Sequence, residues 1–350
     1  MRNVVLMSSV LALLWQSPSR AHAQAADSTA CRLSDANRTW IQRALDGWNN
    51  VRSNALRLPP APFPWMILYD SVCAWDLEPD EALLSNAVPA EVSLVADGKQ
   101  IRVRVRAIST NASLPNGASL PSQAAAFASL YKDGTAPFFV MALPDLWRRD
   151  PENARDPYAD EFFLGVAMHE LTHTRHLAPM LDHLRAIGDE YKLADLTLDD
   201  DVVQNRFQNV EGFRAAFESE RDQLFRAVAE QNPRRRRTAA VEALKKVRAR
   251  QARYYTGSNR PYKEFEELFL SMEGVGQWAA YMFAKRETRA DASNDVIVDF
   301  VRSTRKYWVQ EEGLALFLLI DAIVPDWQRR IFGSTYVSPI DMLETSLTTR

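Results

Sequence analysis

Four of the five histidines in this 350-residue chain fall within fifteen positions. Those four are His169, His173, His176 and His183, and the fifth, His22, lies near the N-terminus. The segment from Met168 to His176 reads Met-His-Glu-Leu-Thr-His-Thr-Arg-His, which contains the pattern H-E-x-x-H. Residues four apart share one face of an α-helix, so the pattern requires a helix here, and we expect one from Asp156-Pro157 to the residue before Pro179.

The spacing of the motif has a chemical reason. Two imidazoles on one helix face can bind one Zn²⁺, which predicts His169 and His173 as metal ligands. Glu170 follows the first ligand and is placed to take a proton from a water molecule at the metal. The alternative is a chance match on an amphipathic helix, which we expect about once in a few hundred such sequences.

With these residues the chain resembles the zincin superfamily of metallopeptidases. Arg175 stands where the extended zincin pattern usually has a hydrophobic residue. The metzincin extension is absent, because His176 replaces its glycine and Pro179 its third histidine. The remaining similarity is to the gluzincin arrangement of exported bacterial proteins, and it implies an α+β zincin-like fold and a downstream glutamate as third ligand.

Glu273 is the candidate for that ligand. It follows Phe269 by four residues beside the apolar stripe of a predicted helix, 261–286, and a charge facing a core needs a partner. Gly274 and Gly276 would let the motif helix approach closely. The segment also resembles the third-ligand helix of several bacterial gluzincin-like families. A buried ion pair with an arginine is the alternative for Glu273, and the fallback ligands are Glu211 and Glu220.

Two further residues are candidates for roles in catalysis. His176 lies about 10 Å along the helix from His169, too far for all three histidines to bind one ion. It would support the site or contact the transition state, or else be a solvated or capping histidine. Tyr281, eight residues after Glu273, would donate to an oxyanion, or else be a core tyrosine. We expect His183 to be structural.

The rest of the chain predicts an α+β protein with strands first and helices later. Helix 34–56 has Ser34 as a possible cap, and apolar runs predict strands 65–69 and 138–143. Asp97-Gly98 predicts a hairpin between 91–96 and 101–108. The later helices are expected at 208–231, 237–256, 261–286 and 294–331. We therefore expect one zincin-like catalytic domain over 26–350, with a mixed part over 26–150 and a helical part with the metal site over 151–350.

The first 25 residues have the pattern of a secretory signal peptide. Arg2 precedes an apolar stretch from Val4 to Trp15, and small residues allow cleavage after Ala23 or Ala25. We therefore expect an exported protein, periplasmic or secreted, without stable membrane insertion. Removing this segment would change the net charge from −3 to about −5, which gives no reason to expect nucleic acid as a partner.

The chain has two cysteines, Cys31 and Cys73. An even number in an exported protein predicts a disulfide, which would hold the N-terminal arm near the first strand. Lipidation of Cys31 is the alternative.

Together these features predict an exported zinc metallohydrolase that acts as a peptidase on a peptide or protein substrate. The strand 138–143 would be the sheet edge along which an extended peptide pairs. Two alternatives stay open. One is a non-catalytic zincin-fold envelope or interaction protein, and the other is a zinc hydrolase of a non-peptide amide.

Overall fold

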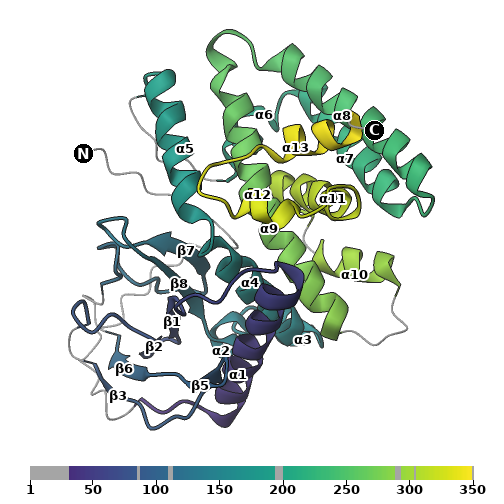
Figure 1. The fold of residues 1–350 in the computed structure, drawn as a ribbon. Helices are drawn as coiled ribbons and strands as arrows, with labels where there is room; N and C mark the ends of the chain where they lie inside the picture. Colours follow the sequence, from purple (N-terminus) through teal and green to yellow (C-terminus); the bar gives the residue numbers. More distant parts are fainter. Residues whose placement is uncertain are drawn as a thin grey trace. The chain divides into compact units, whose positions relative to one another are not determined.

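The computed structural model describes residues 31–84, 87–108, 113–193, 200–287, 293–302 and 305–348. The expected signal peptide lies outside these ranges. The protein is α+β, as predicted, and its contacts divide it into two compact units, with the boundary after Leu177 (Figure 1). The presence of one catalytic domain over 26–350 stays a prediction.

The N-terminal unit contains a six-stranded sheet with the order β3-β6-β2-β1-β8-β7. β1 and β8 are parallel, and every other neighbouring pair is antiparallel. A separate pair, β4 and β5, forms a small hairpin. The strands are β1 Trp65–Tyr69, β2 Cys73–Leu77, β3 Val88–Pro89, β4 Val95–Ala96, β5 Lys99–Gln100, β6 Val103–Ala107, β7 Ala126–Leu130 and β8 Pro137–Ala142.

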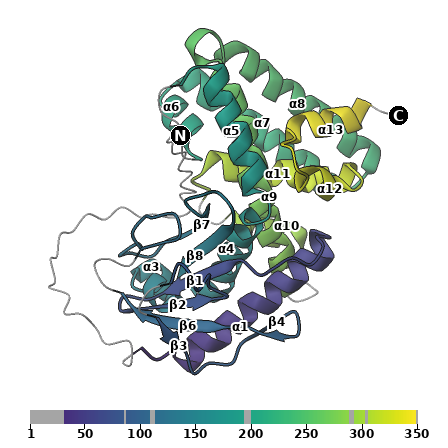
Figure 2. The ribbon, with the colours of Figure 1, turned by 60° about the vertical axis from the view of Figure 1, so that its left-hand side comes forward.

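The central strands are the apolar runs that the sequence predicts. All residues of β1 are buried, as are all residues of β8 after Pro137. Strands enclosed on both faces favour such continuous apolar sequence. Helix α4 (Ala159–His173) packs on β7 and β8 and also contacts α1 (Asp35–Asn50), which Figure 2 shows beside the sheet.

The predicted position of strand 138–143 at the sheet edge is wrong. β8 pairs with β1 on one side and with β7 on the other, so it has no open edge. Its sequence is apolar because it is central, and a central strand offers no backbone groups to a peptide. β7 is the edge strand next to it.

The predicted hairpin is much shorter than expected. Asp97 and Gly98 both adopt positive φ, 51° and 71°, as a tight two-residue turn requires, and the turn joins β4 to β5. The segment after it does not continue this pairing, because β6 pairs with β2 and β3 instead.

The N-terminal helix and the disulfide are confirmed. The Ser34 hydroxyl accepts from the backbone N–H of Asn37 at 3.1 Å and so caps α1, which continues as a π-helix over Val51–Ala55. Cys31 and Cys73 are joined by a disulfide. The bond ties the segment just before α1 to the first residue of β2, a strand that was not predicted from the sequence.

The C-terminal unit is helical. Its helices are α5 Leu177–Glu190, α6 Val202–Phe207, α7 Glu211–Ala229, α8 Pro233–Tyr254, α9 Pro261–Glu287, α10 Asn294–Val301, α11 Trp308–Ile323, α12 Trp327–Ile331 and α13 Pro339–Thr348. The long helix predicted over 294–331 is thus three separate helices. α8 starts earlier than predicted, because the Asn232 side chain caps it and Pro233 occupies its first turn. Across the helices of the described ranges, none has the length and apolar character of a membrane span.

α9 and α11 approach each other closely at two glycines. A Cβ added to Gly274 would lie 2.8 Å from the carbonyl oxygen of Gly313 and 2.7 Å from a ring carbon of Phe317. The sequence predicts that the space at Gly274 admits the motif helix. The close neighbour that the structure shows there is α11.

Candidate metal centre

Helix α4 carries the motif. Its start is preceded by Asp156, whose carboxylate accepts from the backbone N–H of Tyr158 at 2.8 Å. Acidic residues Asp160 and Glu161 occupy its first turn, where their negative charges interact favourably with the positive end of the helix dipole. From Phe163 to His173 every residue is buried, and this stretch includes the whole motif.

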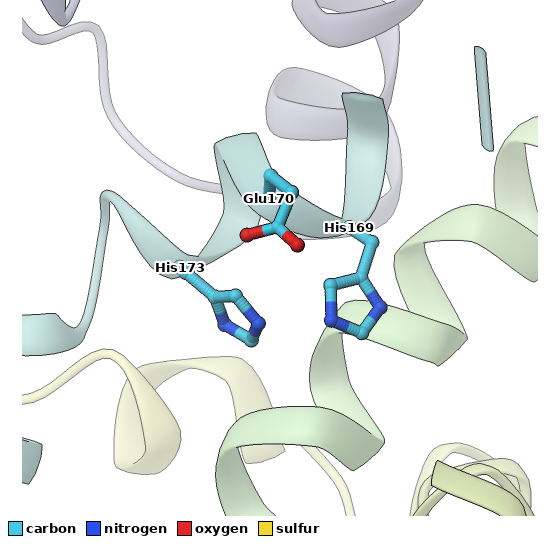
Figure 3. A group of neighbouring side chains, drawn as sticks. All are labelled: His169, Glu170 and His173. Carbon is cyan, nitrogen blue, oxygen red and sulfur yellow. The ribbon is translucent and has the colours of Figure 1, made fainter. Parts of the chain in front are cut away.

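His169, Glu170 and His173 form a compact polar group. One ligand atom from each lies within 4.8 Å of the others. The two imidazole rings are edge to face, with their centroids 4.6 Å apart. In Figure 3 the carboxylate of Glu170 lies above the two rings. His169 is 2% exposed, and the other two side chains are fully buried.

The donor set of this group fits a metal ion. Two imidazole nitrogens and a carboxylate oxygen are the atoms that bind divalent transition metals in proteins. Burial of three ionisable side chains within five residues is unfavourable unless polar or charged partners compensate. A cation shared by the group supplies such compensation, so the site is able to hold a metal ion.

The chain turns directly after the last motif histidine, which corrects the predicted helix from 156 to 178. α4 ends at His173 and α5 begins at Leu177. Three side chains bond to the carbonyl groups near the helix end. Thr172 donates to Met168 O at 2.8 Å, Thr174 donates to Leu171 O at 2.6 Å, and His176 lies with Nδ1 3.0 Å from Thr172 O. Such side-chain bonds compete with continuation of the helix.

His176 is therefore a capping histidine, one of the readings left open by the sequence. A carbonyl oxygen can only accept, so Nδ1 carries the proton in this contact. The ring is 1% exposed and lies edge-on to His173, with centroids 5.4 Å apart. His176 thus supports the last turn of α4 from a position outside the helix.

Arg175, the departure from the zincin pattern, is half-buried beside this turn. Its guanidinium donates to the carbonyl oxygen of Pro59 at 3.4 Å. Burial and the neighbouring charge of Arg52 lower the pKa of Arg175.

Glu273, the predicted third ligand, lies on α9 of the C-terminal unit. It is fully buried, and Gln310 donates to its carboxylate at 3.2 Å. Its role as a ligand stays a prediction. Of the fallback residues, Glu211 is exposed at the start of α7, and Glu220 is paired with Arg250 at 2.5 Å. The pair gives Glu220 a structural role inside the helical unit.

Tyr281 and His183 also belong to the C-terminal unit. Tyr281 packs in a hydrophobic cluster with Ile297 and Leu314, and its hydroxyl donates to Asn294 at 3.3 Å. These contacts are those of a core tyrosine, and its role as an oxyanion donor stays a prediction. His183 stacks on Tyr336 with centroids 4.0 Å apart, and burial lowers its pKa. Stacking on Tyr336 agrees with the structural role expected for His183.

The N-terminal unit contains a groove of about 1300 Å³ that no sequence motif indicates, and its walls include Thr174 and Arg175. Its other lining residues, among them Arg52, Trp65 and Tyr131, come from distant segments and share no motif. Among the lining residues, only Arg175 stood out in the sequence, because the extended zincin pattern usually has a hydrophobic residue at that position. No model of a known protein family, no curated protein and no solved structure matches this chain.

Proposed function

We propose that this protein is an exported zinc-dependent hydrolase with a zincin-like site, and that it cleaves peptide bonds. The observation that carries the proposal is the buried group of His169, Glu170 and His173 on α4, with ligand atoms within 4.8 Å of one another. A structural role alone gives no reason to bury two imidazoles and a carboxylate so close together.

His169 and His173 would hold the ion, and Glu273 is the third ligand that the sequence predicts. Two nitrogens and a carboxylate with an open fourth position form a common catalytic zinc arrangement. When bound, Zn²⁺ lowers the pKa of a water molecule and polarises a carbonyl group.

Glu170 would act as the general base. Its carboxylate lies beside both ligand rings, so it is within reach of a water molecule that approaches the same point. It would accept the proton as that water attacks and pass the proton to the leaving amine. Burial of Glu170 keeps competing water away and strengthens this interaction.

The sheet provides a place for a peptide. β7 is an edge strand of the sheet, and it packs against α4. An extended peptide that adds to such an edge is held by backbone hydrogen bonds whatever its side chains. We therefore assign to β7 the role that the sequence analysis gave to strand 138–143.

Export is proposed from the N-terminal sequence pattern. The disulfide between Cys31 and Cys73 supports it, because such bonds persist in oxidising compartments outside the cytosol.

The test measures zinc binding and hydrolysis separately. We expect His173→Asn to weaken zinc binding at least about 100-fold in a chelator competition titration, because it removes a ligand. Glu170→Gln should keep zinc and lose about 10²- to 10⁴-fold in hydrolysis of a mixed peptide library. Glu273→Gln should weaken zinc binding if it is the third ligand.

Glu161→Gln is the matched control, because Glu161 lies on the same helix but pairs with Arg43 near the surface. It should change neither zinc binding nor hydrolysis. Unchanged hydrolysis by Glu170→Gln would show that the general-base assignment is wrong. Zinc binding by the wild type without hydrolysis of any peptide or other amide would instead identify a non-catalytic protein. Cleavage of non-peptide amides alone would change the proposed substrate class.

A further inference from the structure

The groove in the N-terminal unit lies at one end of the sheet. Trp65 at the start of β1 and Pro137 at the start of β8 line it, together with Tyr131 just after β7. Its volume, about 1300 Å³, exceeds the roughly 300–1000 Å³ typical of small-molecule pockets. It has room for several residues of an extended chain.

Part of the groove wall is formed by the segment that directly follows α4. Thr174 and Arg175 form part of its wall, and they directly follow His173 at the end of α4. The groove also begins where β7 ends. A peptide that pairs with β7 would therefore continue into the groove.

Most charges in the groove are already paired within the protein. Arg52 donates to both carboxylate oxygens of Asp97 at 3.1 Å. Arg102 pairs with Glu78 at 2.9 Å. These two arginines are thus neutralised by acids from the same wall and have little capacity left for a ligand.

Arg175 is different. Within the described part of the chain it has no carboxylate partner, and its hydrogen bond goes to a neutral carbonyl, that of Pro59. A guanidinium has five N–H donors in a fork that fits a carboxylate, so most of its donors are available. Lys99 and Asp80 also lack an ion pair among these residues, but both are exposed to solvent, whereas Arg175 is half-buried.

The remaining lining favours a peptide over a small anion. Trp65 and Tyr131 meet edge to face, with ring centroids 6.0 Å apart, and Phe63 lies on the adjacent segment. These rings offer apolar surface to side chains. Pro60, Pro62 and Pro64 make the segment before β1 stiff and lack backbone N–H groups, which leaves this wall with few backbone donors for a ligand.

We propose that Arg175 binds a carboxylate of the peptide substrate in this groove, so that peptides with a carboxylate at this position are the preferred substrates. The carboxylate is the free C-terminus or an Asp or Glu side chain on the part of the peptide that leaves β7. This inference rests on the proposed peptidase function, and it adds a residue that determines specificity.

Peptide binding without turnover tests the inference. The zinc-loaded Glu170→Gln protein is titrated calorimetrically with hexapeptides that carry a free C-terminus, an amidated C-terminus, an internal Glu or an internal Gln. The first two peptides differ in the charge of the C-terminus, and the last two differ in the charge of one side chain. In one of these two pairs we expect the peptide with the carboxylate to bind about tenfold more tightly than its neutral counterpart, because a charged hydrogen bond forms. Whichever pair shows the difference identifies the source of the carboxylate.

Arg175→Gln, added to the same protein, should remove this preference, and Arg175→Lys should keep part of it. Arg102→Gln is the matched control, because Arg102 lines the same groove but is paired with Glu78; it should leave the preference intact. Circular dichroism checks the folding of each variant.

Three results would overturn the inference. They are equal affinity for acidic and neutral peptides, a preference that persists in Arg175→Gln, and no measurable binding of any peptide. Failure of the proposed function appears differently. If the acid preference depends on Arg175 but the wild type hydrolyses none of these peptides, the groove assignment stands and the peptidase proposal is wrong.

Discussion

His176 is buried beside His173 although it lies outside α4. Its Nδ1 donates to the carbonyl of Thr172, and this bond caps the last turn of α4, which ends at the proposed ligand His173. The ring also packs edge-on against His173. Groups that orient a ligand in this way contribute to metal affinity without touching the ion.

We expect His176→Ala to lower zinc affinity by about tenfold, within the range typical of residues that orient metal ligands. The loss follows because the end of α4 and the ring of His173 become freer. Chelator competition measures the affinity, and His183→Ala is the control, since His183 stacks on Tyr336 in the C-terminal unit. Equal zinc affinity in wild type and His176→Ala would show that His176 has no such role.

The sequence predicted the local part of the site and not the rest. Helical spacing alone brings His169, Glu170 and His173 together, so a local pattern is sufficient. The turn at 174–176 was missed because its cause is side-chain bonding to backbone carbonyls, which apolar periodicity does not reveal. The groove around Arg175 depends on distant segments and was therefore not predictable.

At the scale of elements, the uniform apolar runs of β1 and β8 were predicted as strands, and so was the alternating run that forms β6, although its partners differ from those expected. The mixed strand β2 was missed. β1 and β8 were identified because every position is apolar. β2 was missed because Asp76 interrupts it. In the structure Asp76 is buried and paired with Arg106 at 2.9 Å, and it accepts from the Trp65 indole at 2.9 Å. A buried ion pair between strands cannot be recognised from either strand alone.

Gly274→Ala tests the close approach of α9 and α11. Alanine in place of glycine within a helix normally stabilises by about 0.5–1 kcal/mol. Here the new Cβ would lie 2.8 Å from a backbone oxygen of Gly313, and backbone atoms cannot move away easily. We therefore expect the free energy of unfolding to fall by about 1–3 kcal/mol, measured by urea denaturation.

Gly212→Ala is the control for this substitution. Its Cβ would meet the hydroxyl end of the Tyr254 side chain and no backbone atom. We expect a smaller loss than for Gly274→Ala. If Gly274→Ala were as stable as the wild type, the two helices would have room that the structure does not show.

At the scale of the whole molecule, the stability of the chain should depend on a buried polar network in the C-terminal unit. Arg250 pairs with Glu220 at 2.5 Å and with Glu266 at 2.7 Å, and Tyr255 donates to Glu266 at 2.8 Å. Glu312 on α11 is fully buried near the same group. The sequence did not predict this network, because its members come from four helices.

The network contains three carboxylates for one guanidinium. Burial raises the pKa of Glu312 well above its ordinary value, and the nearby Glu220 and Glu266 raise it further, whereas Arg250 and Arg221 lower it. Burial also raises the pKa of Glu220 to about 7. Folding therefore favours the protonated acids.

A raised carboxyl pKa stabilises the folded protein at acidic pH, and this contribution is lost as pH rises through the folded-state value. Replacing Glu312 by glutamine removes the loss of stability that this carboxyl causes at high pH. We therefore expect Glu312→Gln to unfold about 2–4 °C higher than the wild type at pH 8 and at nearly the same temperature at pH 5. Thermal circular dichroism at both pH values measures this. Glu311→Gln, the control, breaks a pair with Arg302 at 2.7 Å and should lower the midpoint at pH 8 instead. A Glu312→Gln midpoint that differs from wild type equally at both pH values would show that Glu312 does not bind a proton on folding.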